Sequence, residues 1–343
     1  MVSVNEVPVH GPEGIPISQS LVKQISYKIP VTLSQGRNKI QVSVINEKGS
    51  ESPREMLNIV QTSPTVKPNL YVLAIGVSDY LDNDFDLKYA AKDANDLITL
   101  LKTPKTPAFY GQVKTMSIAN QDATRENIIK AKEFLMQVSV DDEVILFVAG
   151  HGLLDDKLNW YFATHDIDFS NPAIRGVKYE ELEGLITGIP ARKKLMMMDA
   201  CHSGEVDKAE SSLVAATVAN SSPNVKSRGF KSKMVVQNPV GLKTSFEMMQ
   251  QLFADLSNGS GAMVISSAGG AEFAFESPQW NNGVFTYSVL EGLKTGNADK
   301  NKDKTITVSE LRDYVIAKVQ NLTQGKQTPT SRKENLEFDF RVW

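Results

Sequence analysis

The chain of 343 residues carries 37 Lys and Arg residues against 40 Asp and Glu residues, which gives a formal net charge of −3. This balance argues against a protein held on nucleic acid or on an anionic membrane by charge alone. Hydrophobic residues make up 41% of the chain and charged residues 22%, an ordinary globular composition that excludes intrinsic disorder and collagen-like structure.

The chain has a single cysteine, Cys201, which excludes an intramolecular disulfide and a metal site built from several thiolates. The opening MVSVNEVPVHGPEG lacks the basic and apolar regions of a secretory signal. No apolar run reaches the roughly 18 residues of a membrane span. We therefore expect a cytoplasmic protein with no membrane and no nucleic-acid partner.

Residues 1–64 are predicted to be rich in β-strands, because the run 39–45 alternates polar and apolar residues before a turn at 46–49. The segment resembles the last strands of an immunoglobulin-like sandwich but is shorter than the ~100 residues of a complete one. It fits either a fragment of such a domain or an extra β-layer packed on the rest of the chain. Prolines among small polar residues predict a linker over 65–69.

Residues 70–343 alternate between strand-like and helical segments, which predicts an α/β domain with a mixed, mostly parallel sheet flanked by helices. Apolar runs typical of strands buried on both faces occur at 71–77, 143–149, 194–198 and 261–267. Apolar residues at helical spacing predict a helix over 87–101. The polar, Ser-rich stretch 205–242 is predicted to be a long exposed loop.

Two of the apolar runs end in reactive side chains. One leads into Gly150-His151-Gly152, and the other into Asp199-Ala200-Cys201. Binding sites of α/β sheets collect at the carboxyl ends of the strands, and an imidazole raises the thiolate fraction of a nearby thiol. His151 and Cys201 are therefore candidates for a base and a nucleophile. The alternative is that Cys201 is a small buried hydrophobe and His151 a turn residue.

The blocks VILFVAGHG and LMMMDACHSG resemble the signature of the caspase-like cysteine peptidases. DACHSG resembles in particular the metacaspase and bacterial orthocaspase branch. The segments YVLAIGVSDY, LKYAAKDANDL, SSAGGAEFAFES and GVFTYSVLEGL also match, in the family's order, over roughly residues 70 to 295. The resemblance implies a caspase-like peptidase domain over 70–343 in a bacterial protein.

The resemblance also implies roles for individual residues. Cys201 matches the nucleophile, His151 the general base, and Gly152 a backbone donor to the oxyanion. Asp199 and Asp93 match acidic residues of the pocket for the side chain that precedes the cleaved bond. Such a pocket favours Arg or Lys, whereas true caspases have basic residues there and cleave after Asp.

Other interpretations of the acids are open. Asp93 alone also fits a solvated helix face, and Glu272 and Glu276 fit either the border of the cleft or structural ion pairs. His202 follows the nucleophile, and we assign it no catalytic role because His151 already fills that of the base.

In the family, the stretch after the nucleophile links the large and small parts of the catalytic unit. We therefore predict that the enzyme processes itself within 205–242. The candidate cleavage sites are the basic residues of this stretch: Lys208, Lys226, Arg228, Lys231 and Lys233. The alternative is that they only make a flexible loop soluble.

Residues 299–310 fit the oxygen-ligand pattern of a calcium loop. The candidate ligands are Asp299, Asn301, Asp303, Thr305 and Glu310. The sixth position is Lys304 instead of the usual glycine, which predicts weakened calcium binding. The alternative is a polar turn that caps the helix expected over 309–319. The chemistry itself requires no cofactor.

The function predicted from the sequence is a cysteine endopeptidase that cleaves after Arg or Lys through an acyl-enzyme on Cys201. Its partners would be protein or peptide substrates with basic residues, together with an activating partner or upstream domain. One alternative is a catalytically silent caspase-like binding or scaffold module. Another is an enzyme of the same clan that acts on a non-protein amide.

Overall fold

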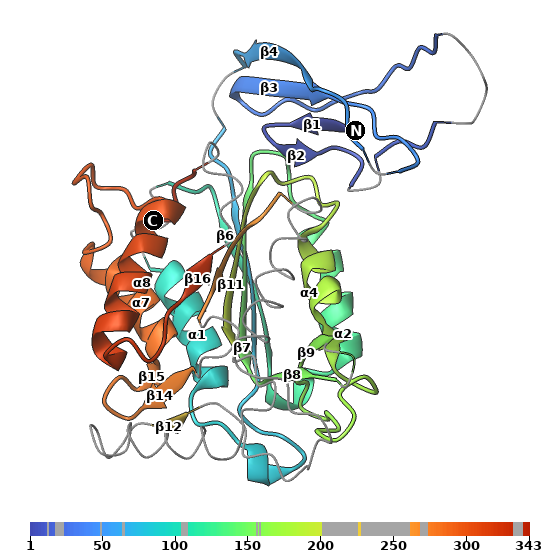
Figure 1. Cartoon of the computed structure of the whole chain (residues 1–343). Helices are drawn as coiled ribbons and strands as arrows, with labels where there is room; N and C mark the ends of the chain where they lie inside the picture. The colour runs from blue at the N-terminus through green and yellow to red at the C-terminus, as the bar shows by residue number, and fades with distance from the viewer. Residues whose placement is uncertain are drawn as a thin grey trace.

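The computed structural model describes most of the chain and places an N-terminal β-sheet above a larger central sheet (Figure 1). The described residues are 1–11, 14–17, 24–48, 50–63, 66–103, 109–155, 157, 159–200, 226–227, 261–267, 274–331 and 339–343. Within them, no helix is long and apolar enough to cross a membrane.

The predicted β-rich segment is a four-stranded antiparallel sheet, with strand order β2-β1-β3-β4. Its strands are β1 (Val2–Val4), β2 (Val7–Pro8), β3 (Gly36–Val42) and β4 (Glu55–Gln61). Val2, Val4 and Ile40 form a small core of its own. The run predicted as a strand over 39–45 corresponds to β3, which begins and ends three residues earlier, at Gly36 and Val42.

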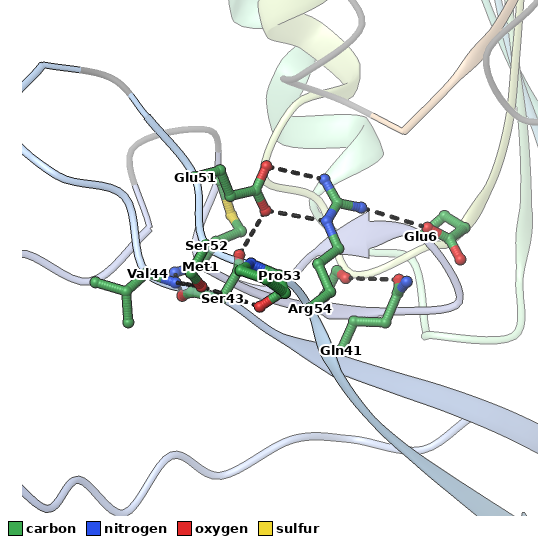
Figure 2. Close-up of polar contacts among 10 residues, drawn as sticks. Met1, Glu6, Gln41, Ser43, Val44, Glu51, Ser52, Pro53 and Arg54 are labelled. Atoms are coloured by element: carbon green, nitrogen blue, oxygen red, sulfur yellow. Dashed lines mark hydrogen bonds and ion pairs between the residues drawn. The ribbon is translucent and has the colours of Figure 1, made fainter.

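An ion-pair network holds the chain ahead of β4 to the rest of this sheet (Figure 2). The Arg54 guanidinium donates to both carboxylate oxygens of Glu51, at 3.0 and 3.2 Å, and lies 3.8 Å from Glu6. The hydrogen bond from Arg54 lowers the pKa of Glu51 below its ordinary value. Because these side chains are partly exposed, the network contributes little to stability.

The central sheet has six strands in the order β16-β13-β11-β7-β5-β6, and all except β16 run parallel. The strands are β5 (Leu70–Gly76), β6 (Val113–Ala119), β7 (Glu143–Gly150), β11 (Lys193–Ala200), β13 (Met263–Ser266) and β16 (Thr330–Ser331). Every residue of β5 and β7 is buried. The predicted mixed, mostly parallel sheet is confirmed.

Helices cover both faces of this sheet (Figure 1). One face carries α1 (Ala90–Leu101), α7 (Val284–Thr295) and α8 (Val308–Thr323), and the other carries α2 (Arg125–Lys130), α3 (Lys132–Leu135) and α4 (Tyr179–Ile186). Alternate residues of β5 enter the two cores, Leu73 and Ile75 on one side and Val72 and Ala74 on the other. This two-sided burial explains why the strands read as continuous apolar runs.

Among the described residues, two short sheets and two short helical turns lie outside the N-terminal and central sheets. They are β8 (Gly152–Leu154), β9 (Trp160–Phe162) and β10 (Val177–Lys178), then β12 (Lys226–Ser227), β14 (Phe275–Ser277) and β15 (Asn282–Gly283), with the turns Asn83–Phe85 and Asn120–Asp122.

The helix predicted over 87–101 begins three residues later, at Ala90. The reason is a distant carboxylate: Glu276 on β14 accepts the backbone N–H groups of Lys88 and Tyr89 at 3.0 and 3.3 Å. These contacts satisfy donors that a helix end leaves unpaired. The helix predicted over 309–319 is α8, which begins one residue earlier and ends at Thr323.

The N-terminal sheet contacts the amino ends of the central strands. Arg192, just before β11, donates to the Thr32 carbonyl and to Ser34 Oγ, and Asp141 near the start of β7 accepts the Gln35 N–H at 3.2 Å. The carboxyl ends of β7 and β11 lie at the opposite end of the sheet. The sheet of β1–β4 therefore docks far from the strand ends that lead into His151 and Cys201.

Candidate active site

The two strands that lead into the predicted reactive residues are neighbours in the central sheet. β7 and β11 run parallel, with Ala149 opposite Asp199 and Gly150 opposite Ala200. His151 is the next residue after β7, and Cys201 is the next residue after β11. Cys201 itself lies outside the described residues. The register places the ends of the two strands at the same level, at the carboxyl end of the sheet.

The His151 side chain is buried, and a main-chain carbonyl fixes its ring. Its Nε2 lies 2.8 Å from the carbonyl oxygen of Phe85. A carbonyl can only accept, so this contact places the proton on Nε2. In the neutral imidazole the lone pair is then on Nδ1, the nitrogen available to act as a base.

Two aromatic rings pack against His151, and a third ring stacks on one of them. Tyr80 lies 5.2 Å and Phe169 lies 6.0 Å from the imidazole, measured between ring centroids. Phe85 and Phe169 stack on each other with centroids 3.8 Å apart. The Tyr80 hydroxyl accepts the backbone N–H of His151 at 3.1 Å. His151 therefore has a packed, largely apolar wall.

Asp199 is buried near the end of β11 and meets the start of α7. Its Oδ2 accepts the Thr286 hydroxyl at 2.6 Å and the Thr286 backbone N–H at 3.4 Å. Thr286 belongs to the first turn of the helix, where N–H groups and the helix dipole favour a carboxylate.

Asp93 is buried in the first turn of α1 and reaches the same segment of chain. It accepts the Asn282 amide at 2.8 Å and the Gly283 N–H at 3.1 Å. The two acids matched to the pocket therefore converge on residues 282–286. The alternative of a solvated helix face for Asp93 is wrong, because the side chain is fully buried.

The other residues singled out by the sequence lie in different places. Gly152 opens β8 beside Phe162, directly after His151. Glu276 is buried and caps the start of α1, so its role in the fold is structural. Glu272 and His202 lie outside the described residues.

The predicted processing loop also lies largely outside the described residues. Lys208, Arg228, Lys231 and Lys233 belong to that part. The backbone of Lys226 is in the short strand β12, where it pairs with Glu276 of β14.

The oxygen-bearing side chains of the predicted calcium loop accept hydrogen bonds from their own loop. Asp299 Oδ2 accepts the Lys304 N–H at 2.9 Å, and Asp303 Oδ1 accepts the Thr305 N–H at 2.8 Å. Glu310 Oε1 accepts the Asn301 N–H at 3.2 Å. The hydrogen bonds from Thr305 lower the pKa of Asp303. Among the residues that the structure describes, no group of three or more His, Cys, Asp or Glu side chains could hold a metal ion.

The partners of these residues that sequence reasoning missed include the Phe85 carbonyl and Thr286. The first is a main-chain atom, which every residue carries and no motif marks. The second lies 87 positions from Asp199, a separation that only the folded chain closes.

Comparisons with known proteins agree with this architecture. A family model described as a caspase domain matches residues 70–341. The crystal structure of a protein from Geobacter sulfurreducens is similar, with 18% sequence identity, a TM-score of 0.51, and coverage of 79% of this chain and 93% of that chain. No curated protein matches.

At this low identity, the likeness to the Geobacter protein shows the fold alone. The family match is more informative, because it spans most of the chain, from the start of β5 almost to the last residue. It includes His151, Cys201, Asp93 and Asp199 within a single matched range. On this evidence, the chain belongs to the caspase-domain family of cysteine peptidases.

Proposed function

We propose that this chain is a cysteine endopeptidase that cleaves peptide bonds after Arg or Lys, with Cys201 as nucleophile and His151 as base. The observation that supports the proposal is the register of β7 and β11, which pairs Gly150 with Ala200, the residues directly before His151 and Cys201. The contact of His151 Nε2 with the Phe85 carbonyl supports it, because it keeps Nδ1 as the basic nitrogen.

The reaction follows the chemistry of an imidazole and a thiol. His151 Nδ1 takes the proton of the Cys201 thiol, and the sulfur attacks the substrate carbonyl to form a tetrahedral intermediate. Backbone N–H groups of Gly152 and Cys201 hold its oxyanion. The imidazolium then gives its proton to the leaving amine as the C–N bond breaks. A water molecule, deprotonated by His151, hydrolyses the remaining thioester and frees Cys201.

Specificity for Arg or Lys rests on Asp93 and Asp199. Both carboxylates are buried and both are held by the segment 282–286. Negative charge fixed near a binding pocket favours a cationic side chain, and a guanidinium matches a carboxylate with two parallel hydrogen bonds. Substrates are therefore proteins or peptides with basic residues before the cleaved bond.

Self-processing within 205–242 and activation by a partner or an upstream domain are part of the same proposal. An enzyme selective for basic residues would find targets in its own chain at Lys208, Arg228 and the neighbouring lysines. Cleavage should appear in wild-type protein over time and be absent in Cys201→Ala. A chain that stays intact while the enzyme cleaves peptides would contradict self-processing.

The test of the main proposal is cleavage of fluorogenic peptides with Arg, Lys or Asp before the reporter group. We expect release from the Arg and Lys peptides by the wild type, and none by Cys201→Ala. Release after Asp would contradict the role of Asp93 and Asp199 and leave the Cys and His roles intact. No cleavage of any peptide, with the Cys201 thiol titrating as intact, would favour a silent binding module.

A further inference from the structure

The loop that leaves the carboxyl end of β5 contacts His151 at two points. This loop, residues 78–87, is closed at its base by the Leu87 N–H, which donates to the Ser78 carbonyl at 2.9 Å. From within it, the Phe85 carbonyl contacts the His151 ring and the Tyr80 hydroxyl accepts the His151 backbone N–H. One loop therefore holds both the ring and the main chain of His151.

Tyr80 is built into this contact. Its side chain is 2% exposed, and its ring packs 5.2 Å from the imidazole. A Cβ added at Gly150 would lie 3.1 Å from the Tyr80 hydroxyl oxygen. The hydroxyl can therefore approach β7 this closely because Gly150 has no side chain.

Asp86 holds Tyr80 in place from the other side of the loop. Its Oδ1 accepts the Tyr80 backbone N–H at 2.8 Å. The next residue, Leu81, donates its N–H to the His165 carbonyl at 2.9 Å. The backbone on both sides of the Tyr80 side chain is thereby anchored.

We propose that Tyr80 is a positioning residue for His151, and that Asp86 acts through Tyr80. The hydroxyl of Tyr80 fixes the direction in which the chain leaves β7, and its ring fixes the plane of the imidazole. Together with the Phe85 contact, this fixes the orientation of the ring and of its Nδ1. The inference rests on the proposed function of His151 as a base.

The physical reason is the geometric demand of proton transfer. A base must lie within hydrogen-bond reach of the proton that it takes, and a displacement of about 1 Å can cost about a hundredfold in rate. Tyr80→Phe keeps the ring and removes only the hydroxyl, so the buried N–H of His151 loses its acceptor.

The matched control is Tyr71→Phe. Tyr71 is also buried, sits at the other end of β5, and donates its hydroxyl to the Gln137 carbonyl at 3.2 Å. We expect Tyr80→Phe to lower kcat about tenfold with KM almost unchanged, since positioning governs the chemical step. Tyr71→Phe should keep kcat, whatever its melting temperature. Asp86→Ala should lower kcat as Tyr80→Phe does, and Asp86→Asn, which retains the acceptor oxygen, should restore it.

Equal kcat values for Tyr80→Phe and Tyr71→Phe would overturn the inference. If the wild type cleaves no peptide, the proposed function fails and the positioning is still tested, by nitrogen NMR of the His151 ring. Tyr80→Phe should then change the chemical shifts of the ring nitrogens, because the main chain that carries the ring has lost the Tyr80 hydroxyl as an anchor, and Tyr71→Phe should not. An unchanged His151 spectrum in Tyr80→Phe would contradict the role of Tyr80.

Discussion

Gly150, the last residue of β7, and Ala200, the last residue of β11, are register partners on neighbouring parallel strands. The pairing continues along eight residues of each strand, starting with Glu143 opposite Lys193. A parallel ladder of this length fixes the relative height of the two strand ends. It therefore places the residue before His151 level with the residue before Cys201.

We predict that Gly150→Ala lowers both stability and activity. The added methyl carbon would lie 3.0 Å from the Phe162 ring and 3.1 Å from the Tyr80 hydroxyl, and the backbone there has a φ of +156°. We expect the free energy of unfolding to fall by about 1–3 kcal/mol, as for other overpacked sites. Urea denaturation and peptide cleavage would measure the two effects.

The matched control is Gly184→Ala, inside α4, where an added Cβ has no neighbour within 4 Å. Alanine favours the helix, so this variant should be more stable by about 0.5–1 kcal/mol and keep its activity. Equal behaviour of the two variants would show that the end of β7 tolerates a side chain.

A second prediction concerns the charge on Asp93. Asp93→Asn keeps an acceptor oxygen for Asn282 and Gly283 but removes the negative charge. We expect kcat/KM for Arg peptides to fall by at least about tenfold, because a charged hydrogen bond to the substrate becomes a neutral one.

Asp96→Asn is the control for Asp93→Asn. Asp96 lies on the same helix and also accepts the Asn282 amide at 2.8 Å, but it is not buried. It should leave the selectivity for Arg unchanged. Equal losses in both variants would place the effect in Asn282 and the local fold, against a role of Asp93 in the pocket.

The sequence predicted those strands that form long, continuous apolar runs. The buried runs that became β5, β7, β11 and β13 are continuous because both faces of the sheet are covered. β6 was not predicted, since it lies at the edge of the sheet and only one of its residues, Ile118, is buried. The two-residue strand β16 leaves no periodicity to detect.

For the candidate site too, the sequence predicted individual residues but not the contacts between distant ones. His151, Asp93 and Asp199 were found because their side chains are unusual at the ends of apolar segments or match a motif. The N-terminus of α1 was misplaced, because Glu276 caps it from 187 positions away. Contacts of this kind depend on tertiary structure, which local pattern does not encode.

A third prediction concerns Lys194, a buried lysine at the start of β11. Its Nζ donates to the Ile186 carbonyl at 3.2 Å, and burial lowers its pKa from 10.5 to about 8. The folded protein therefore favours the neutral amine. Stability from this group is full above pH 10.5 and is lost as the pH falls through about 8.

At neutral pH the free energy of unfolding is therefore lower by about 3 kcal/mol than above pH 10.5, since each unit between the two pKa values corresponds to ~1.4 kcal/mol. In Lys194→Met, the rise in unfolding free energy between pH 7 and pH 10 should be smaller by about 2 kcal/mol than in the wild type. Urea denaturation at each pH measures it, with the exposed Lys130→Met as control. Parallel curves for wild type and Lys194→Met would show that burial does not lower the pKa of the amine.

A fourth prediction tests the loop 299–310. Lys304 has a φ of +71°, a conformation that costs a lysine energy and a glycine none. Lys304→Gly should therefore raise the free energy of unfolding by about 0.5–1 kcal/mol. If calcium binds this loop, the removal of the positive charge should also increase the melting-temperature rise that calcium causes.

Lys302→Gly is the control for Lys304→Gly, because Lys302 has a φ of +63° and does not occupy the sixth position of the loop. It should relieve strain in the same way, and because it removes a charge outside the sixth position, its response to calcium should be smaller than that of Lys304→Gly. No calcium effect on wild type, Lys304→Gly or Lys302→Gly would mean that the loop is a polar turn that caps α8.

The last prediction concerns Arg192, which joins the N-terminal sheet to the start of β11. Arg192 is 6% exposed, its guanidinium donates to Thr32, Ser34 and Asn38, and burial lowers its pKa. In Arg192→Met these acceptors lose a charged donor, which costs about 1–3 kcal/mol. Limited proteolysis should then cut between residues 24 and 35 faster than in the wild type. Arg175→Met, which removes a half-exposed arginine 3.8 Å from Asp166, should not change the rate.

Because β11 leads from Arg192 to Asp199, a fall in peptide cleavage by fully folded Arg192→Met would show that the docked N-terminal sheet also supports the site. Unchanged proteolysis would mean that other contacts, such as that of Gln35 with Asp141, hold the sheet without Arg192.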